Sequence, residues 1–391
     1  PKKYYTLKDM KEEAAKAQAI GCESLYLDPG WDTNFASKIW DEERLGTFKS
    51  FTEMLKRDYN LKCSLHTPLS GWCNPTSYSS TMYRMDRFGR RLTWERARGS
   101  VTSPLCGAAR PYLEETARRL KALARDGAVY FMFDGLLYHA ECWDPQHGHR
   151  VPARREEHAQ AACRLARKIH AEYPQVLIEM HDPVAGGSTV RYAPIYYGHG
   201  RAPAGEEYSQ ALSFDSVWAF ELMWMPMEDL LSGRAIALYY YNLAYNLPLY
   251  IHIDLRTDNV HALVFWWNAS TCRHLGIGGT HKDPAVQKAH QEAMRSYRRL
   301  SPFFKAGTFY GVDETLHIHT HPSEPATVIN CFNLEERQAQ REVEFIPEAF
   351  GLDPQRAYQV VGVPARVTGK GYILTFSVPG FGHQLAEIKA A

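Results

Sequence analysis

The sequence lacks a strong excess of charge of either sign. Its 45 Lys and Arg residues nearly balance its 44 Asp and Glu residues, which leaves a formal net charge of +1. It also lacks a dense stripe of Lys and Arg, and proteins bind phosphate backbones through clustered basic side chains. The composition therefore argues against a nucleic-acid partner.

A hydrophobic run with the character of a membrane span is also missing. The longest stretch without a charged residue, 235–253, is long enough to cross a bilayer, but it contains Asn242, Asn246, Pro248 and His252. This pattern predicts a buried helix followed by a strand. No signal peptide is visible. We therefore expect no membrane partner.

Cysteine pairs at regular spacing are absent. The eight Cys residues are scattered along the chain. This favours free thiols in a reducing compartment such as the cytoplasm, although an even number leaves disulfides open. The chain opens at Pro1 without an initiator Met, so we expect it to be processed or cut from something longer. The compartment and the oligomeric state stay open.

Several catalytic signatures are missing as well. No G-x-G-x-x-G motif follows a predicted strand, and no Ser nucleophile elbow or reactive Cys–His signature occurs. The first predicted strand has no His, so it lacks the His-x-His of metal-dependent barrel hydrolases. His317, His319 and His321 alternate along a predicted strand and are interpreted as one solvated face. We expect no cofactor and no metal.

Another group of potential ligands is predicted to lie in a loop. It consists of His147 and His149 with Glu141. Because these residues lie in a loop, we expect no metal there either.

The chain does contain short β-rich runs that alternate with amphipathic helices up to about residue 300, which is typical of βαβ units. Strands are predicted at 24–28, 62–66, 92–105, 128–134, 176–180, 216–221, 249–254 and 275–278. One helix is marked by Pro111 in its first turn and by Gly127 at its end. Eight units predict a closed (β/α)8 TIM barrel over residues 1–302, with an open doubly wound sheet as the alternative.

The pattern changes from about residue 303. Five short strands with turn signals between them are predicted at 308–312, 315–321, 327–332, 341–346 and 372–378. They predict a small antiparallel β-sandwich domain over residues 303–391. The predicted fold class is therefore α/β, with a barrel followed by this β-domain.

Carboxylates gather at the ends of the predicted barrel strands: Asp28, Asp134, Glu179, Asp182, Glu221 and Asp254. A single strand-end Asp is often a helix cap. Several on one face of a barrel are harder to explain that way, because the active site of such a barrel lies at the carboxyl ends of its strands. Glycoside hydrolysis requires one ionised carboxylate and one protonated carboxyl group.

Long loops follow three of these strands, at 67–110, 135–152 and 183–205. Loops of this length usually carry function. They contain Trp72, Trp94, Trp143 and the Gly-rich segment 185–188. We interpret these as stacking platforms for a sugar and as a place where the backbone closely approaches a ligand.

Several segments together resemble a known family. They are 25–31 (LYLDPGW), 48–67, 109–134 (ending in YFMFD), the Gly-rich segment 185–188, and 217–221 (VWAFE). This series is similar to the L-D-D-G-W, K-F-G-L-W, R-P-E-V to Y-I-K-W-D, C-S-G-G-G-R and F-W-T-S-D motifs of the melibiase-type α-galactosidases, glycoside hydrolase families 27 and 36. The terminal β-domain is also similar to that family's.

The resemblance implies a retaining, α-specific glycosidase with a carbohydrate substrate. Asp134 takes the place of the family's nucleophile, and Glu221 that of its acid/base. Further candidates for substrate contact lie at the predicted strand ends and in the loops after them: Asp28, Trp31, His66, Trp72, Glu179, His181, Asp182, Gly186, Gly187, Trp218, His252 and Asp254.

Two departures from the family motifs affect the choice of sugar. Pro29 replaces the second Asp of D-D-G-W, and Met132 replaces the Lys of K-W-D. Each polar sugar group left without its partner costs roughly 1–3 kcal/mol. The sugar and the linkage therefore stay open. The alternatives are a non-catalytic carbohydrate-binding barrel and a metal-dependent barrel hydrolase.

Overall fold

The computed structural model describes residues 4–70, 73–96, 100–133, 140–181, 195–196, 250–254, 262–271, 274–278 and 280–391. The chain divides into two compact units, Pro1–Tyr196 and Tyr197–Ala391, and each is described by itself. None of the helices in the described ranges is both long and apolar enough to cross a membrane.

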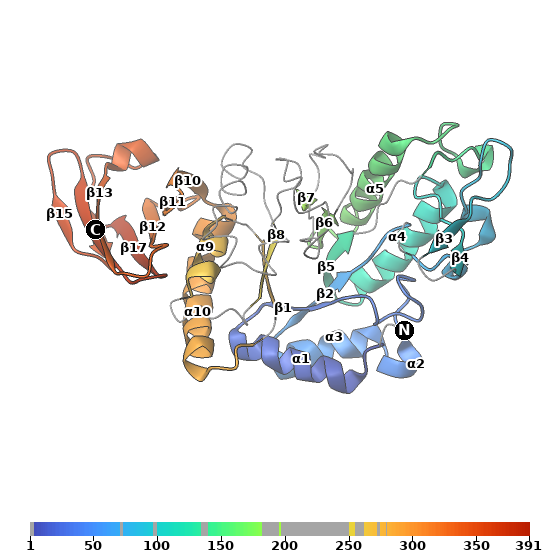
Figure 1. The fold of residues 1–391 in the computed structure, drawn as a ribbon, viewed down its shortest axis with the longest axis horizontal. Helices are drawn as coiled ribbons and strands as arrows, with labels where there is room; N and C mark the ends of the chain where they lie inside the picture. The colour runs from blue at the N-terminus through green and yellow to red at the C-terminus, as the bar shows by residue number, and fades with distance from the viewer. Residues whose placement is uncertain are drawn as a thin grey trace. The chain divides into compact units, whose positions relative to one another are not determined.

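The first unit is built on a parallel sheet (Figure 1). Its strands, in sheet order, are β1 (Ser24–Leu27), β2 (Lys62–His66), β5 (Ala128–Phe133), β6 (Leu177–His181) and β7 (Ile195–Tyr196). The order along the sheet follows the order along the chain, as in successive βαβ units. The strands predicted at 24–28, 62–66, 128–134 and 176–180 are therefore confirmed to within a residue or two.

The helices of the first unit begin and end where the sequence marks them. They are α1 (Leu7–Ile20), α2 (Glu42–Leu45), α3 (Phe48–Tyr59), α4 (Arg110–Arg125) and α5 (Arg155–His170). Thr6 and Asp9 form a capping box at the start of α1, which ends at Gly21 in the left-handed conformation. Pro111 lies in the first turn of α4, as predicted.

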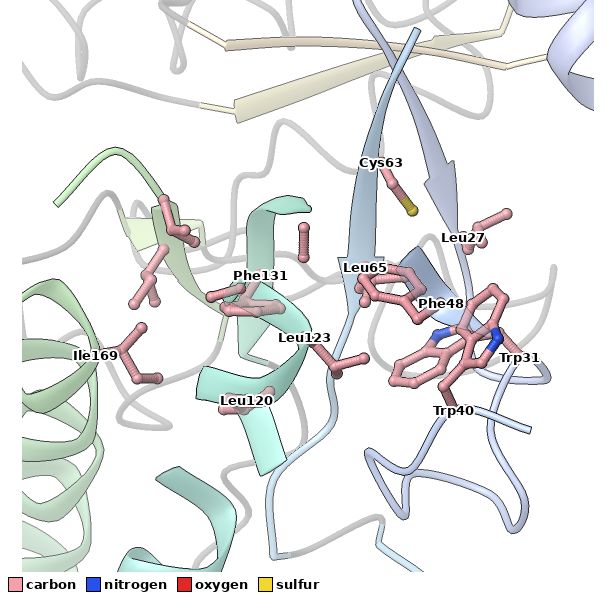
Figure 2. Packing of buried hydrophobic residues seen from close by; sticks show 14 of the residues in the cluster. Leu27, Trp31, Trp40, Phe48, Cys63, Leu65, Leu120, Leu123, Phe131 and Ile169 are labelled. Atoms are coloured by element: carbon pink, nitrogen blue, oxygen red, sulfur yellow. The ribbon is translucent and has the colours of Figure 1, made fainter. Parts of the chain in front are cut away.

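One face of the sheet is apolar and lies against these helices. Alternate strand residues such as Leu27, Leu65 and Phe131 form one buried cluster with helix residues such as Leu120 and Ile169 (Figure 2). Burying a side chain of this size stabilises the fold by roughly 1.5–3 kcal/mol. The period of two along each strand therefore determines which face the helices cover.

The segment predicted as a third barrel strand, 92–105, folds differently. It contains β3 (Trp94–Arg96) and β4 (Ser100–Thr102), which pair antiparallel with each other. The parallel neighbour of β2 is β5 instead. A parallel pair needs a crossover of a dozen or more residues, whereas a short connection suffices for a hairpin.

The second unit begins its described part with another parallel pair. β8 (Tyr250–Asp254) and β9 (His274–Gly278) pair in register, and α9 (Leu263–Thr271) connects them along the chain. The predicted strands at 249–254 and 275–278 are thus confirmed, while the one predicted at 216–221 lies outside the described residues. Asp283 caps the start of α10 (Pro284–Ala306): its carboxylate accepts a hydrogen bond from the Ala285 N–H at 2.7 Å.

The C-terminal region is antiparallel, as predicted. One sheet has the order β10 (Thr308–Asp313), β11 (Leu316–Thr320), β12 (Ala326–Phe332), β17 (His383–Ala390) and β14 (Tyr358–Val361). The other has the order β13 (Ala339–Phe345), β16 (Tyr372–Val378) and β15 (Ala365–Val367). Residues from both sheets, among them Ile329 and Phe376, share one hydrophobic cluster. The predicted domain boundary at 302/303 falls inside α10 and stays a prediction.

The histidines of β11 are not on a solvated face, and this prediction was wrong. His317 and His319 are 0% and 2% exposed. The Nδ1 of His317 lies 2.5 Å from the hydroxyl of Ser270 in α9, and its Nε2 lies 3.1 Å from the Glu314 carbonyl. Burial lowers the pKa of His317 to about 3. Alternation identified the strand, but the helix covering its second face decided the exposure.

Candidate functional site

The second face of the parallel sheet carries polar and aromatic side chains. Residues paired in register on parallel strands share a face. Tyr26 pairs with Ser64, which pairs with Tyr130. One step nearer the carboxyl ends, His66 pairs with Met132, and Met132 pairs with Glu179. We call this the strand-end face, defined by Tyr26, His66, Tyr130, Met132 and Glu179 together with Asp28, which follows β1.

Asp28 and His66 form a close pair on this face. Oδ1 of Asp28 lies 2.7 Å from Nδ1 of His66, the last residue of β2. The Asp28 side chain is 52% exposed and that of His66 is 12% exposed. A carboxylate at this distance fixes the orientation of the imidazole ring. Two of the predicted site residues, 38 positions apart in the chain, are thus brought into contact.

Tyr130 and Glu179 form a second pair. The Tyr130 hydroxyl donates to Oε2 of Glu179 at 2.5 Å, and Glu179 is 1% exposed. A buried carboxyl group needs such a partner, because burial without hydrogen bonds is costly. The bond fixes the position of Glu179 on the strand-end face.

Tyr26 connects the two pairs. Its ring stacks on His66 with centroids 6.1 Å apart and is tilted against Tyr130 at 6.2 Å. Its hydroxyl donates to the sulfur of Met132 at 3.1 Å. Sequence reasoning missed Tyr26 and Tyr130, although both share the period-two parity of the polar residues at their strand ends. Following every second residue back from those strand ends along β1 and β5 would have identified both tyrosines.

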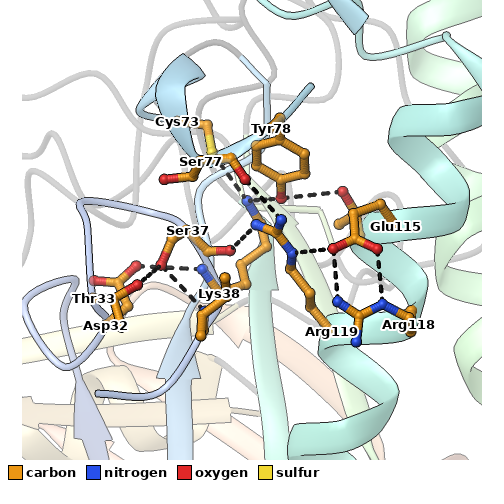
Figure 3. Close-up of polar contacts among 12 residues, drawn as sticks. Asp32, Thr33, Ser37, Lys38, Cys73, Ser77, Tyr78, Glu115, Arg118 and Arg119 are labelled. Atoms are coloured by element: carbon orange, nitrogen blue, oxygen red, sulfur yellow. Dashed lines mark hydrogen bonds and ion pairs between the residues drawn. The ribbon is translucent and has the colours of Figure 1, made fainter. Parts of the chain in front are cut away.

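A separate polar network holds loops of the first unit to α4 (Figure 3). Arg119 donates to the backbone carbonyls of Ser37 and Ser77 and to Glu115, each at 2.7 Å. The ammonium of Lys38, a buried residue, donates to the Ala36 carbonyl at 2.9 Å. A hydrogen bond from Arg118 lowers the pKa of Glu115 to about 2. Arg119 is thus bonded to loop carbonyls and to a carboxylate of its own helix, and Lys38 to a loop carbonyl, which indicates a structural role.

No family model and no curated protein matches the sequence. Solved structures do match the chain. A glycoside hydrolase family 36 α-galactosidase from Geobacillus stearothermophilus, in complex with raffinose, has a TM-score of 0.63 at 12% identity, over 99% of this chain and 54% of that one. An α-galactosidase from Lactobacillus brevis has a TM-score of 0.62 at 14% identity, over 99% of this chain and 53% of that one. A family 27 β-L-arabinopyranosidase from Geobacillus stearothermophilus, in complex with arabinose, has a TM-score of 0.57 at 10% identity, over 99% and 94%.

The fold resembles that of glycoside hydrolases. The similarity predicted from the sequence motifs is therefore confirmed at the level of structure, across nearly the whole chain. The chain spans about half the length of the α-galactosidases it matches. At this level of identity the comparison concerns the fold alone.

Trp31 belongs to the core rather than to the strand-end face. It is 1% exposed and stacks on Trp40 with ring centroids 6.0 Å apart (Figure 2). Both rings belong to the cluster formed by the sheet and its helices. We therefore leave Trp31 out of the proposed site: apolar packing holds its ring in the interior.

The other predicted site residues are described only in part. The backbones of His181, His252 and Asp254 lie in strands, at the carboxyl end of β6 and within β8. β8 belongs to the second unit. The remaining candidates lie outside the described residues: Trp72, Asp134, Asp182, Gly186, Gly187, Trp218 and Glu221.

Proposed function

We propose that this chain is a glycoside hydrolase that cleaves an α-glycosidic bond with Asp134 as nucleophile and Glu221 as acid/base. The observation that carries this proposal is the strand-end face. The parallel sheet is apolar where the helices cover it, but its other face holds the Asp28–His66 and Tyr130–Glu179 pairs. Polar groups with fixed positions beside aromatic rings suit a sugar, whose hydroxyls need partners and whose C–H faces stack on rings.

A (β/α)8 barrel is part of the proposal. The described parallel strands are β1, β2, β5, β6, β7, β8 and β9. With the strand predicted at 216–221, they would supply the eight that such a barrel needs. The glycosidase folds that the chain resembles support this closure. The antiparallel region after α10 then follows the barrel.

The role of Asp134 follows from its place in the chain. It comes directly after Phe133, the last residue of β5. Strand alternation predicts that its side chain shares a face with Tyr130 and Met132. Retention requires the two carboxyl groups about 5–5.5 Å apart, so that one attacks the anomeric carbon while the other protonates the leaving oxygen.

Asp28, His66 and Glu179 are proposed to bind sugar hydroxyls. The half-exposed Asp28 carboxylate can accept from a hydroxyl, and His66 is held in position beside it. We keep the candidates of the loops and of the other strand ends in the same proposed role: Trp72, His181, Asp182, Gly186, Gly187, Trp218, His252 and Asp254.

The sugar is not assigned to galactose. Met132 occupies the place of the Lys in the family's K-W-D motif, and its thioether accepts from Tyr26. A thioether supplies neither a charge nor a donor to a galactose hydroxyl. The same observation favours a second candidate, a carbohydrate-binding barrel without catalysis.

The test is a panel of fluorogenic α-glycosides, with sugar binding measured by calorimetry on the same samples. Turnover by the wild type that is lost in Asp134→Asn, with sugar binding retained, supports the hydrolase. Binding without turnover in the wild type supports the second candidate. Turnover that survives Asp134→Asn and depends on added metal would identify a metal-dependent hydrolase.

A further inference from the structure

Four potential metal ligands converge in the loops of the first unit. Cys106 lies just before α4, whereas Cys142, His147 and His149 lie between β5 and α5. One ligand atom from each residue lies within 4.8 Å of all the others. Sγ of Cys142 is 3.3 Å from Nδ1 of His147, and Sγ of Cys106 is 3.4 Å from Nε2 of His149.

Two of these separations match the edges of a tetrahedral zinc site. Zinc binds thiolate sulfur at about 2.3 Å and imidazole nitrogen at about 2.0–2.1 Å, so the edges of the tetrahedron measure roughly 3.3–3.8 Å. The two sulfur–nitrogen distances of 3.3 and 3.4 Å have this length. Two sulfur and two nitrogen ligands in a tetrahedral arrangement suit zinc better than a harder cation such as Mg²⁺ or Ca²⁺.

The histidine tautomers are set for metal binding. Nε2 of His147 lies 2.9 Å from the Thr81 carbonyl, and Nδ1 of His149 lies 2.9 Å from the Arg150 carbonyl. A carbonyl only accepts, so each of these nitrogens carries the proton and donates it. The opposite nitrogen of each ring then keeps its lone pair, and it is the one that faces a cysteine sulfur. Metal-binding histidines are usually oriented by such a bond from their second nitrogen.

The backbone between His147 and His149 brings both rings to the cluster. The Asp144 carboxylate accepts from the Gln146 N–H and caps the 3₁₀ helix Pro145–His147. Gly148 then has φ 74°, in the left-handed region, and a Cβ there would meet the Cβ of Arg110 at 3.3 Å. The chain thus turns sharply between His147 and His149, and both rings reach the same cluster.

Hydrogen bonds also tie together the loops that carry the cysteines. Cys142 exchanges two backbone hydrogen bonds with Ala153, and the Cys106 N–H donates to the Met82 carbonyl at 2.8 Å. The buried guanidinium of Arg84 donates to the carbonyls of Leu105, directly before Cys106, and of Ala140, two positions before Cys142. These bonds hold the two cysteine-bearing loops together.

We propose that Cys106, Cys142, His147 and His149 bind a zinc ion in a closed structural site. Four protein ligands fill the tetrahedron and leave no position for a substrate, and Cys106, Cys142 and His147 are buried. The ion fastens the segment after β5, which begins at Asp134, to the segment that precedes α4. The proposal differs from the expectation of no metal that the sequence alone supported, and it does not depend on the proposed hydrolase activity.

The first experiment measures metal content. The full chain is purified without chelators, and zinc is quantified by inductively coupled plasma mass spectrometry. We expect one zinc per chain in the wild type and a loss of at least tenfold in Cys142→Ala and His149→Ala. Cys163→Ala is the matched control, because Cys163 is also buried and free but lies in α5, outside the cluster. It should keep its zinc.

Two further measurements keep the proposal testable if the alanine variants fail to fold. Cobalt-substituted wild type should display the visible absorption of a tetrahedral site with two thiolates. His149→Cys should bind zinc with equal stoichiometry, since it retains four ligands. Removing zinc from the wild type should lower its Tm by about 5 °C or more, and adding zinc should restore it.

Three results would overturn the proposal. One is a Cys106–Cys142 disulfide in peptide mass spectra of unreduced protein. Another is wild type with reduced thiols that takes up no zinc when zinc is added. The third is full zinc content in folded Cys142→Ala and folded His149→Ala. None of these results bears on the carboxylate mechanism, because that is tested at Asp134.

Discussion

Histidines occur on strands of both units, and their surroundings differ in an instructive way. His66 stands at the end of β2 beside the half-exposed carboxylate of Asp28. His317 stands inside β11 and is fully buried between a serine hydroxyl and a backbone carbonyl. The first has a charged partner within reach of solvent, whereas the second has neutral partners and no access to water. A ligand can therefore reach the His66–Asp28 pair but not His317, which contributes to the packing of the β region.

The largest expected effect is the loss of turnover when the proposed nucleophile, Asp134, is replaced. Asp134→Asn should lower kcat by about 10⁴-fold or more, because loss of a nucleophile removes the covalent route. The readout is turnover of a fluorogenic α-glycoside. A mechanism-based fluoroglycoside should label Asp134 in the wild type. Activity at the wild-type level in Asp134→Asn, or inversion of the anomeric carbon by product NMR, contradicts this role.

The effect of Glu221→Ala should depend on the leaving group. Proton donation contributes about 10²–10⁴-fold for a poor leaving group and little for an activated aryl glycoside. We therefore expect a large loss of kcat on alkyl or sugar leaving groups and near-normal bond cleavage on dinitrophenyl substrates. An equal loss on both kinds of substrate is incompatible with an acid/base role.

Substitutions of Asp28 and His317 are expected to have opposite effects: the first lowers activity, and the second lowers stability. Asp28→Asn should lower kcat/KM by about 10–100-fold, since a hydrogen bond to a charged group contributes about 1.5–3 kcal/mol, while changing Tm little. His317→Asn should lower the free energy of unfolding by about 2–4 kcal/mol and leave kcat of the folded fraction unchanged. The opposite outcome, with His317 affecting kcat and Asp28 only stability, would break the comparison.

The smallest expected effect is a pH dependence of stability. Burial depresses the pKa of His317 to about 3, against 6.5 for a solvent-exposed imidazole such as that of the unfolded chain. The unfolded chain therefore binds the proton first, and stability falls as pH drops below about 6.5, by up to about 1.4 kcal/mol per pH unit. Between pH 7 and pH 5 this amounts to about 2 kcal/mol.

Urea unfolding at pH 7 and pH 5 measures this effect. His317→Phe should reduce the difference between the two pH values, and the remaining slope belongs to other groups such as His290, whose pKa burial lowers to about 4. A pH dependence identical in the wild type and in His317→Phe would show that His317 is not held neutral by its surroundings.

The amino-acid sequence was sufficient to predict elements whose signals are local. The short β-rich runs of β2 and β5, Pro111 in the first turn of α4 and Asp283 at the start of α10 mark segments that fold as expected. Each signal depends on contacts within a few residues, or on a period that one face of a sheet imposes. The similarity to glycosidases was also visible from such segments.

Only the tertiary structure decided which residues are buried and which come into contact. It buried Trp31 against Trp40, covered β11 with α9, and paired β3 with β4 instead of adding a strand beside β2. It also brought Cys106 to Cys142, and Tyr26 to Met132. The local sequence pattern predicts to which face of its own helix or strand a side chain points. Whether that side chain is exposed, and which ligands it joins, depends on the other segments that pack against it. The contacts of Cys106 with Cys142 and of Tyr26 with Met132 join residues tens of positions apart, which no periodicity in the sequence encodes.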